Sequence, residues 1–144
     1  MKLHRDVRDF IASLTSHRVE YVIVGGHAVA FHGHPRFTGD IDFFVRPSEE
    51  NLHRVEDAIA AFGFEEVRET GVKPGRVLQL GRVPNRIDVL TEVTGLAFDE
   101  AWSSRVPALL DGLPVAFVSR EALVQNKRAA GRPKDLADLE VLKD

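Results

Sequence analysis

The segment YVIVGGHAVAFHGHPRFTGDIDFFV, residues 21–45, places the tightest constraint on what this chain can fold into. It opens with a β-branched apolar run of strand length, residues 21–24, which stops at Gly25 and Gly26. Glycine tolerates unusual backbone angles better than any other residue, so we expect a buried strand that ends in a tight loop. A short helix over residues 27–32 follows, and the next glycine and proline end it, because proline cannot continue a helix.

Strand character returns around two aspartates, Asp40 and Asp42. In a strand, residues two apart project from the same face, so these carboxylates point together while Ile41 and Phe43 point the other way. This geometry suits a divalent cation.

A third carboxylate, Asp88, lies in the later run RIDVL, residues 86–90. Its neighbours Ile87 and Val89 share the opposite face of the expected strand, so Asp88 projects from a strand whose other face is buried. Carboxylates are the hard oxygen ligands that hold Mg²⁺ or Mn²⁺, and two such ions can activate a hydroxyl and neutralise a leaving pyrophosphate. Taken alone, an Asp-x-Asp is more often a solvated feature of an edge strand, and a Gly-Gly before a helix is more often a simple turn.

The other segments alternate between helices and strands without a linker or an internal repeat. Helical periodicity and capping residues predict four helices, over residues 3–16, 48–62 with Ser48 as cap, 120–130 with Ser119 as cap, and 133–142. Strands are expected over 64–70 and 76–80, as a hairpin around the turn-rich residues 71–75, and over 86–90 and 113–118. Residues 96–112 predict a short helix near Trp102 and irregular structure around Pro107.

Composition bounds the class of protein. At 144 residues the chain has the usual size of one domain, and we expect a single domain over residues 1–144. The chain contains no cysteine, so any metal must be held by oxygen or imidazole. No run approaches the roughly 20 apolar residues that span a bilayer, and the N-terminus lacks a signal core, so a cytoplasmic protein without membrane contact is expected. The net charge of −3 gives no general argument for nucleic-acid binding.

In combination, these motifs resemble those of a known superfamily. The Gly25-Gly26 pair, a short helix, an Arg-x-Thr at 36–38, the paired aspartates and Asp88 are similar to the signature of the DNA polymerase β-like nucleotidyltransferases. The arrangement is close to small bacterial members, including the abortive-infection toxin group. The run LVQNKRAAGRPKDLAD, residues 123–138, resembles an ending that is frequent in that group. The matches cover about half of the chain in segments.

The resemblance implies an α/β (α+β) fold, in which helices back a mixed, mostly antiparallel sheet and the first strand runs antiparallel to the Asp40 strand. It also implies metal-dependent chemistry with Mg²⁺ or Mn²⁺ as cofactor. By position, Asp40, Asp42 and Asp88 would bind the metal and carry catalysis, with Asp88 as ligand or as base for the acceptor hydroxyl. The residues expected to contact the nucleotide, through its phosphates or nearby, are Gly25, Gly26, His27, Arg36, Thr38 and Lys127.

Several conspicuous residues have a simpler reading. His32 and His34 could be imagined as a metal pair, but a loop histidine usually makes a local hydrogen bond. The basic residues Arg128, Arg132 and Lys134 could receive a nucleic acid, yet a solvated face or pairing with Asp135 and Asp138 is as well supported. Asp138 is expected to brace Lys134 or Lys127 rather than to bind metal, and Trp102 is expected in the core or at its rim.

Three hypotheses for function follow. The first is a Mg²⁺-dependent enzyme that transfers a nucleoside monophosphate from an NTP to a hydroxyl of a tRNA, a protein or a small molecule. The second is a nucleotide-binding or partner-binding member of a toxin-antitoxin pair with little turnover, with an antitoxin or a second copy as its partner. The third is an α/β scaffold with solvated carboxylates. Three aspartates on one sheet face favour catalysis, because like charges are costly to gather without a use.

Overall fold

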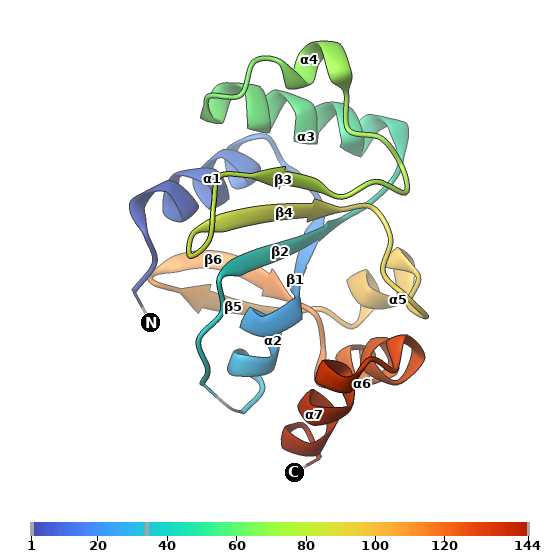
Figure 1. The fold of residues 1–144 in the computed structure, drawn as a ribbon. Coiled ribbons are helices and arrows are strands. Elements are labelled where there is room, and N and C mark those ends of the chain that lie inside the picture. Colours follow the sequence, from blue (N-terminus) through green and yellow to red (C-terminus); the bar gives the residue numbers. More distant parts are fainter. Residues whose placement is uncertain (1, 34, 144) are drawn as a thin grey trace.

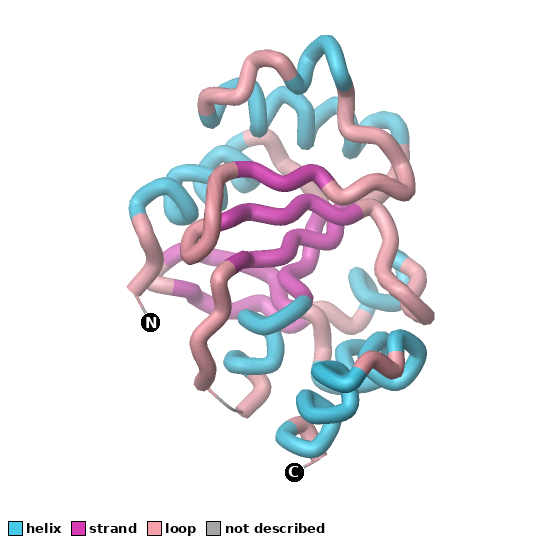
Figure 2. Tube along the Cα trace, viewed as in Figure 1, coloured by secondary structure: helices cyan, strands magenta, loops and turns pink. Residues whose placement is uncertain are grey.

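The computed structural model describes residues 2–33 and 35–143, and these build one sheet with helices on both faces (Figures 1 and 2). The strands of this sheet are β1 (Tyr21–Val24), β2 (Asp40–Val45), β3 (Leu78–Leu80), β4 (Arg86–Leu90), β5 (Val106–Leu110) and β6 (Leu113–Phe117). The helices are α1 (Arg5–Ser16), α2 (Gly25–Phe31), α3 (Glu49–Phe62), α4 (Val67–Thr70), α5 (Phe98–Ser103), α6 (Arg120–Ala130) and α7 (Pro133–Val141).

The strands lie in the order β3-β4-β2-β1-β6-β5. Neighbours β1 and β2, β3 and β4, and β5 and β6 run antiparallel, whereas β2 with β4 and β1 with β6 are parallel. The expected mixed, mostly antiparallel sheet is therefore confirmed, as is the antiparallel pairing of the first strand with the Asp40 strand. The parallel pairing of β2 with β4 brings two distant acidic segments side by side.

Helices α1 and α3 cover one face of the sheet, and an aromatic cluster joins them to it. Phe10 of α1 packs edge-to-face on Phe43 of β2 and on Phe62 of α3, with ring centroids 5.3 Å apart in both pairs. Aromatic pairs of this geometry stabilise a core beyond the area that they bury. On the opposite face, Phe44 packs against Phe98 of α5 at 5.1 Å. Burial of alternate β2 residues on the first face directs Asp40 and Asp42 to the second.

The helix signals in the sequence are largely confirmed. The apolar stripe of α1 is buried, and Ser48 and Ser119 cap α3 and α6 by accepting hydrogen bonds from the amides of Asn51 and Ala122. Helix α2 differs from the expectation at its start, because it begins at Gly25 itself rather than after the two glycines.

Three predictions of strand structure were wrong in whole or in part. Residues 64–70 form a turn followed by α4, and among the α4 residues only Val67 is buried, so no strand face is available there. Strand β3 is shorter than residues 76–80 and pairs with β4 rather than with residues 64–70. Around Pro107 the chain forms β5 instead of irregular structure. Strand β5 lies at the edge of the sheet, the position in which a proline without an N–H is tolerated.

None of the described helices is long and apolar enough to cross a membrane. Trp102 is partly buried against the core and stacks on Phe98, as expected for a residue at the rim.

Candidate active site

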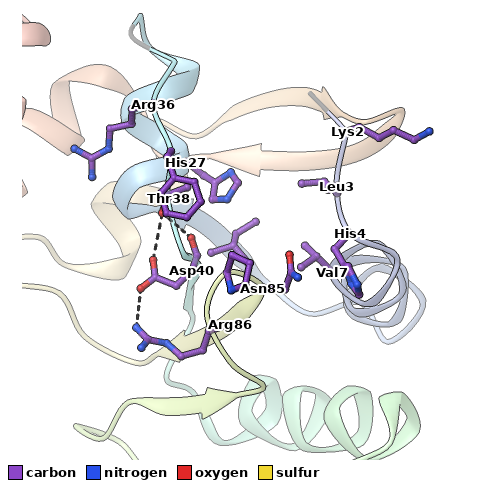
Figure 3. A pocket seen from close by; sticks show the side chains of 13 residues that line it. Lys2, Leu3, His4, Val7, His27, Arg36, Thr38, Asp40, Asn85 and Arg86 are labelled. Atoms are coloured by element: carbon purple, nitrogen blue, oxygen red, sulfur yellow. Dashed lines mark hydrogen bonds and ion pairs between the residues drawn. The ribbon is translucent and has the colours of Figure 1, made fainter.

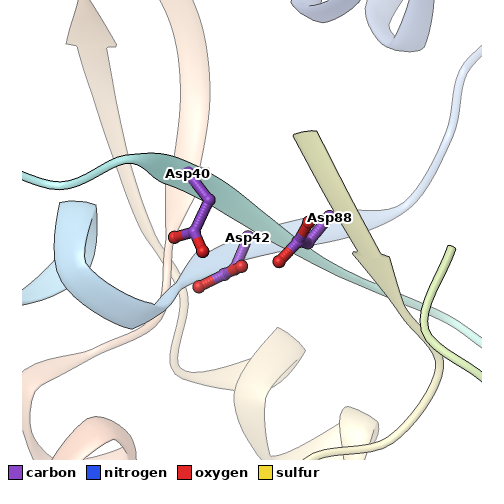
Figure 4. Close-up of side chains that lie close together, drawn as sticks. All are labelled: Asp40, Asp42 and Asp88. Atoms are coloured by element: carbon purple, nitrogen blue, oxygen red, sulfur yellow. The ribbon is translucent and has the colours of Figure 1, made fainter. Parts of the chain in front are cut away.

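Three carboxylates meet on the second face of the sheet, where β2 and β4 run side by side (Figure 4). Asp42 and Asp88 are register partners on the two strands, and Asp40 lies two residues before Asp42. One carboxylate oxygen of each residue lies within 4.8 Å of the others. The structure thus brings together the three aspartates that the sequence singled out.

This acidic cluster is electrostatically strained. Burial, followed by the charges of Asp40 and Asp88, raises the pKa of Asp42 from 3.8 to about 7, and only Lys134 acts in the opposite direction among the causes. A set of hard oxygen donors in which like charges oppose ionisation is chemically suited to a divalent cation, whose charge would relieve that repulsion. The three carboxylates would therefore be the residues that hold Mg²⁺ or Mn²⁺.

The two glycines allow the start of α2 to approach the carboxylates. Gly25 adopts φ +70°, and a Cβ placed on it would lie 2.0 Å from Oδ2 of Asp42. A Cβ on Gly26 would lie 2.9 Å from Oγ1 of Thr38, whose hydroxyl donates to the Asp40 carbonyl at 2.9 Å. A larger residue at either position would collide with the site, so both glycines are required by close approach, and Gly25 is also favoured by its backbone angle.

A cavity of about 560 Å³ opens over the cluster. Its lining contains eight of the nine predicted site residues, namely Gly25, Gly26, Arg36, Thr38, Asp40, Asp42, Asp88 and Lys127. Residues that the sequence did not assign to the nucleotide also line it, among them Thr94, Asn126, Arg132 and Lys134. Cationic side chains, among them Lys127, Arg132 and Lys134, therefore line the same cavity as the acidic cluster.

The ninth residue, His27, lines a second cavity of about 220 Å³ on another side of Asp40 (Figure 3). Burial lowers the pKa of His27, and the charge of Asp40 partly opposes that shift. His27 is therefore close to the acidic cluster but is not part of the lining of the larger cavity. His32 hydrogen-bonds the Val118 carbonyl at 2.7 Å, which is the local role expected for it, and His34 lies outside the described residues.

Lys127, predicted to contact phosphate, is held in a buried ion cluster. Its Nζ lies 3.0 Å from Oδ2 of Asp138 and 3.3 Å from Oδ1 of Asp135, and Arg36 and Arg132 pair with the same two carboxylates. The expectation that Asp138 braces Lys127 is confirmed. This cluster ties α6 and α7 to the loop before β2, so Lys127 has a structural role whether or not it also contacts a ligand.

Arg86 is the residue that sequence reasoning missed. Its Nη2 lies 2.7 Å from Oδ2 of Asp40, while its Nε and Nη2 contact the two oxygens of Asp88 at 2.9 and 3.0 Å. The signal was present, because Arg86 stands two residues before Asp88 and so shares its face of the strand. The same alternation that paired the aspartates therefore places a guanidinium among them.

Among the solved structures with a similar fold are the following three, and two of them are described as nucleotidyltransferases or nucleotidyltransferase-like. A candidate nucleotidyltransferase from Thermotoga maritima matches with a TM-score of 0.65 and 18% identity, over 94% of this chain and 89% of that one. ANT(2″)-Ia in complex with adenylyl-2″-tobramycin matches with a TM-score of 0.60 and 18% identity, over 94% and 84%. An antigenic nucleotidyltransferase-like protein from Paracoccidioides brasiliensis gives 0.56 and 16%, over 96% and 73%.

A comparison with curated proteins found no match. The family model described as "Nucleotidyltransferase of unknown function (DUF6036)" matches residues 2–142. Since that match covers nearly the whole chain, the protein belongs to this nucleotidyltransferase family.

Proposed function

We propose that this chain transfers a nucleoside monophosphate from an NTP to a hydroxyl acceptor and releases pyrophosphate, with a divalent cation, Mg²⁺ or Mn²⁺, as cofactor. The observation that supports this most is the convergence of Asp40, Asp42 and Asp88 to within 4.8 Å at the floor of the larger cavity. A protein that only needed a solvated face would have no reason to gather three like charges so closely, one of them buried. The family and the fold of its neighbours agree with a transferase.

In the proposed reaction, the acceptor oxygen forms a bond to the α-phosphorus while the bond to the bridging α–β oxygen breaks. The hydroxyl proton passes to a carboxylate of the cluster, for which Asp88 is our candidate. The cation, when bound, would supply charge neutralisation for the leaving pyrophosphate. Lys134 and Arg132 line the same cavity and would attract the triphosphate, and Gly25 and Gly26 leave room for it beside the carboxylates.

The acceptor would enter from the second cavity, which shares Asp40 and Thr38 with the larger one. His27 would then contact the acceptor side of the reaction rather than the nucleotide. The acceptor we expect is a tRNA, a protein or a small molecule. ANT(2″)-Ia is described with an adenylylated tobramycin, a small molecule, and such acceptors belong in the test.

The test offers each of the four NTPs, labelled at the α-phosphate, with Mg²⁺ to the whole chain together with cellular RNA, protein extract or small-molecule alcohols. Label transfer with release of pyrophosphate is expected. Asp40→Asn and Asp42→Asn should abolish it while the circular dichroism spectrum is unchanged, whereas Asp9→Asn, an exposed acid away from the cavity, should not. Binding of NTP without turnover under every condition would instead support the nucleotide-binding or toxin-antitoxin hypothesis.

A further inference from the structure

Arg86 places a positive charge from the chain itself within the acidic cluster. Its position follows from the sheet, because Arg86 is the register partner of Asp40 across the parallel pair and lies two residues from Asp88 on β4. Side chains at these positions share one face, so the guanidinium reaches both aspartates without leaving its strand. Figure 3 shows Asp40 held between Thr38 and Arg86.

The contacts of Arg86 use the oxygens that a cation would need. The guanidinium binds both oxygens of Asp88 and one oxygen of Asp40 at 2.7 to 3.0 Å. Paired, charge-assisted hydrogen bonds of this kind are stronger than neutral ones, and two like charges at one carboxylate set repel each other. A divalent cation and Arg86 would therefore compete for the carboxylates of Asp88 and Asp40.

The side chain of Arg86 also has a second position available to it. Its side chain is 27% exposed and lines both cavities, so it lies at their border rather than being locked in the core. A guanidinium binds phosphate oxygens as well as it binds carboxylate oxygens, again through paired hydrogen bonds. A polyphosphate in the larger cavity would offer such oxygens beside the acidic cluster.

We propose that Arg86 is a positioning residue that competes with the divalent cation for Asp40 and Asp88, and that it moves to the phosphates when a nucleoside triphosphate binds. This inference rests on the proposed function. The site would then bind the cation weakly alone and tightly with nucleotide, because the nucleotide removes the competing charge. By thermodynamic linkage, the cation would strengthen nucleotide binding by the same factor.

The experiment measures Mn²⁺ binding to the whole chain by electron paramagnetic resonance of the free ion, with and without a non-hydrolysable α,β-methylene NTP. In the wild type we expect the analogue to tighten Mn²⁺ binding by about tenfold, a usual size for coupling between two sites. In Arg86→Gln, Mn²⁺ alone should bind about tenfold more tightly than in the wild type, and the tightening by the analogue, corrected for the Mn²⁺ that the analogue binds in a protein-free titration, should be smaller than in the wild type. Arg86→Lys, which keeps the charge, should stay close to the wild type.

Arg82→Gln is the matched control, because Arg82 is an exposed arginine just before the same strand. It should behave as the wild type. Equal or weaker Mn²⁺ binding by folded Arg86→Gln would overturn the proposal, as would absence of coupling in the wild type or of Mn²⁺ binding in every variant. The wild-type and Arg86→Lys titrations keep the test decisive should Arg86→Gln fail to fold. Since no acceptor or turnover is involved, Mn²⁺ coupling without pyrophosphate release would contradict the proposed function alone.

Discussion

Asp42 and Asp88 face each other across the parallel strands β2 and β4, and the pKa of Asp42 is raised to about 7. Arg86 bonds to Asp88 and Asp40, while the hydrogen bonds described for it include none to Asp42. Asp42 is therefore the carboxyl that carries the electrostatic cost of the cluster. Under the proposed function, this stability would be given up for catalysis, as is common for active-site residues.

This cost predicts how stability depends on pH. Between about pH 4 and pH 7 the folded protein holds a proton on Asp42 that the unfolded chain, with a pKa of 3.8, has lost. The contribution of Asp42 to the free energy of unfolding is therefore full below pH 4, falls as pH rises to about 7, and then levels off. Asp42→Asn should remove this fall and be more stable than the wild type at pH 8 by roughly 1–3 kcal/mol.

Urea denaturation at pH 5, 6, 7 and 8, without divalent cations, measures this difference. Asp9→Asn serves as the control, since it removes an exposed acid. Profiles for the wild type and Asp42→Asn that run parallel over this range would show that Asp42 titrates normally.

The shared face of Asp40 and Asp42, and the facing direction of Asp88 on its own strand, could be predicted because they depend on local alternation. Asp40 and Asp42 share a face at any strand position, and burial of Ile87 and Val89 fixes the direction of Asp88. The pairing of β2 with β4 cannot be read from local sequence, because tertiary packing sets it. Asp40 and Arg86, which contact each other across this pair, are 46 residues apart in the chain. That strand pairing places Arg86 opposite Asp40 and Asp88 opposite Asp42. For this reason the contact of Arg86 was not predicted, and Asp88 was assigned to the site only through the family resemblance.

The errors in the fold have similar physical causes. Residues 64–70 carry only two apolar residues, Phe64 and Val67, and their spacing of three is helical rather than strand-like. They form a turn and α4 beside α3 instead. Pro107 reads as a strand breaker in isolation. It is accommodated because β5 is an edge strand with one free side, and edge position is a property of the whole sheet.

Gly25→Ala should damage the site more than its size suggests. The new methyl group would meet Oδ2 of Asp42 at 2.0 Å, and alanine at φ +70° is itself strained by about 1–2 kcal/mol. Gly112→Ala is the matched control, because Gly112 has φ +80° with open space around it. Both variants should lose similar backbone stability in thermal unfolding, but only Gly25→Ala should lose Mn²⁺ binding and nucleotidyl transfer. Equal Mn²⁺ affinity in the two variants would show that Gly25 does not shape the cluster.

Lys127→Met should be strongly destabilising. The substitution leaves Asp135 and Asp138 buried with one fewer cation. Breaking a buried ion pair costs about 3 kcal/mol or more. The loss in the free energy of unfolding is reduced here, because Arg36 and Arg132 still pair with the two acids. Lys143→Met removes an exposed lysine that pairs with Glu140, and should change the free energy of unfolding by less than about 0.5 kcal/mol. Chemical denaturation compares the two. A small effect at Lys127 would mean that its charge serves a ligand rather than the fold.

Lys134 provides the most direct link between the electrostatics of the cluster and nucleotide binding. Its charge lowers the pKa of Asp42 against the larger effect of burial, and its exposed side chain lines the larger cavity. In Lys134→Gln the pKa of Asp42 should rise further, so the loss of stability with pH should extend to higher pH than in the wild type.

The affinity of Lys134→Gln for the α,β-methylene NTP should fall by about twofold to fivefold, as an exposed charge allows, and this fall should be smaller at high salt. Calorimetric titration and urea denaturation measure the two effects, with Lys73→Gln, an exposed lysine outside both cavities, as control. If Lys134→Gln and Lys73→Gln weaken the analogue equally, the effect belongs to net charge, and Lys134 has no specific part in the site.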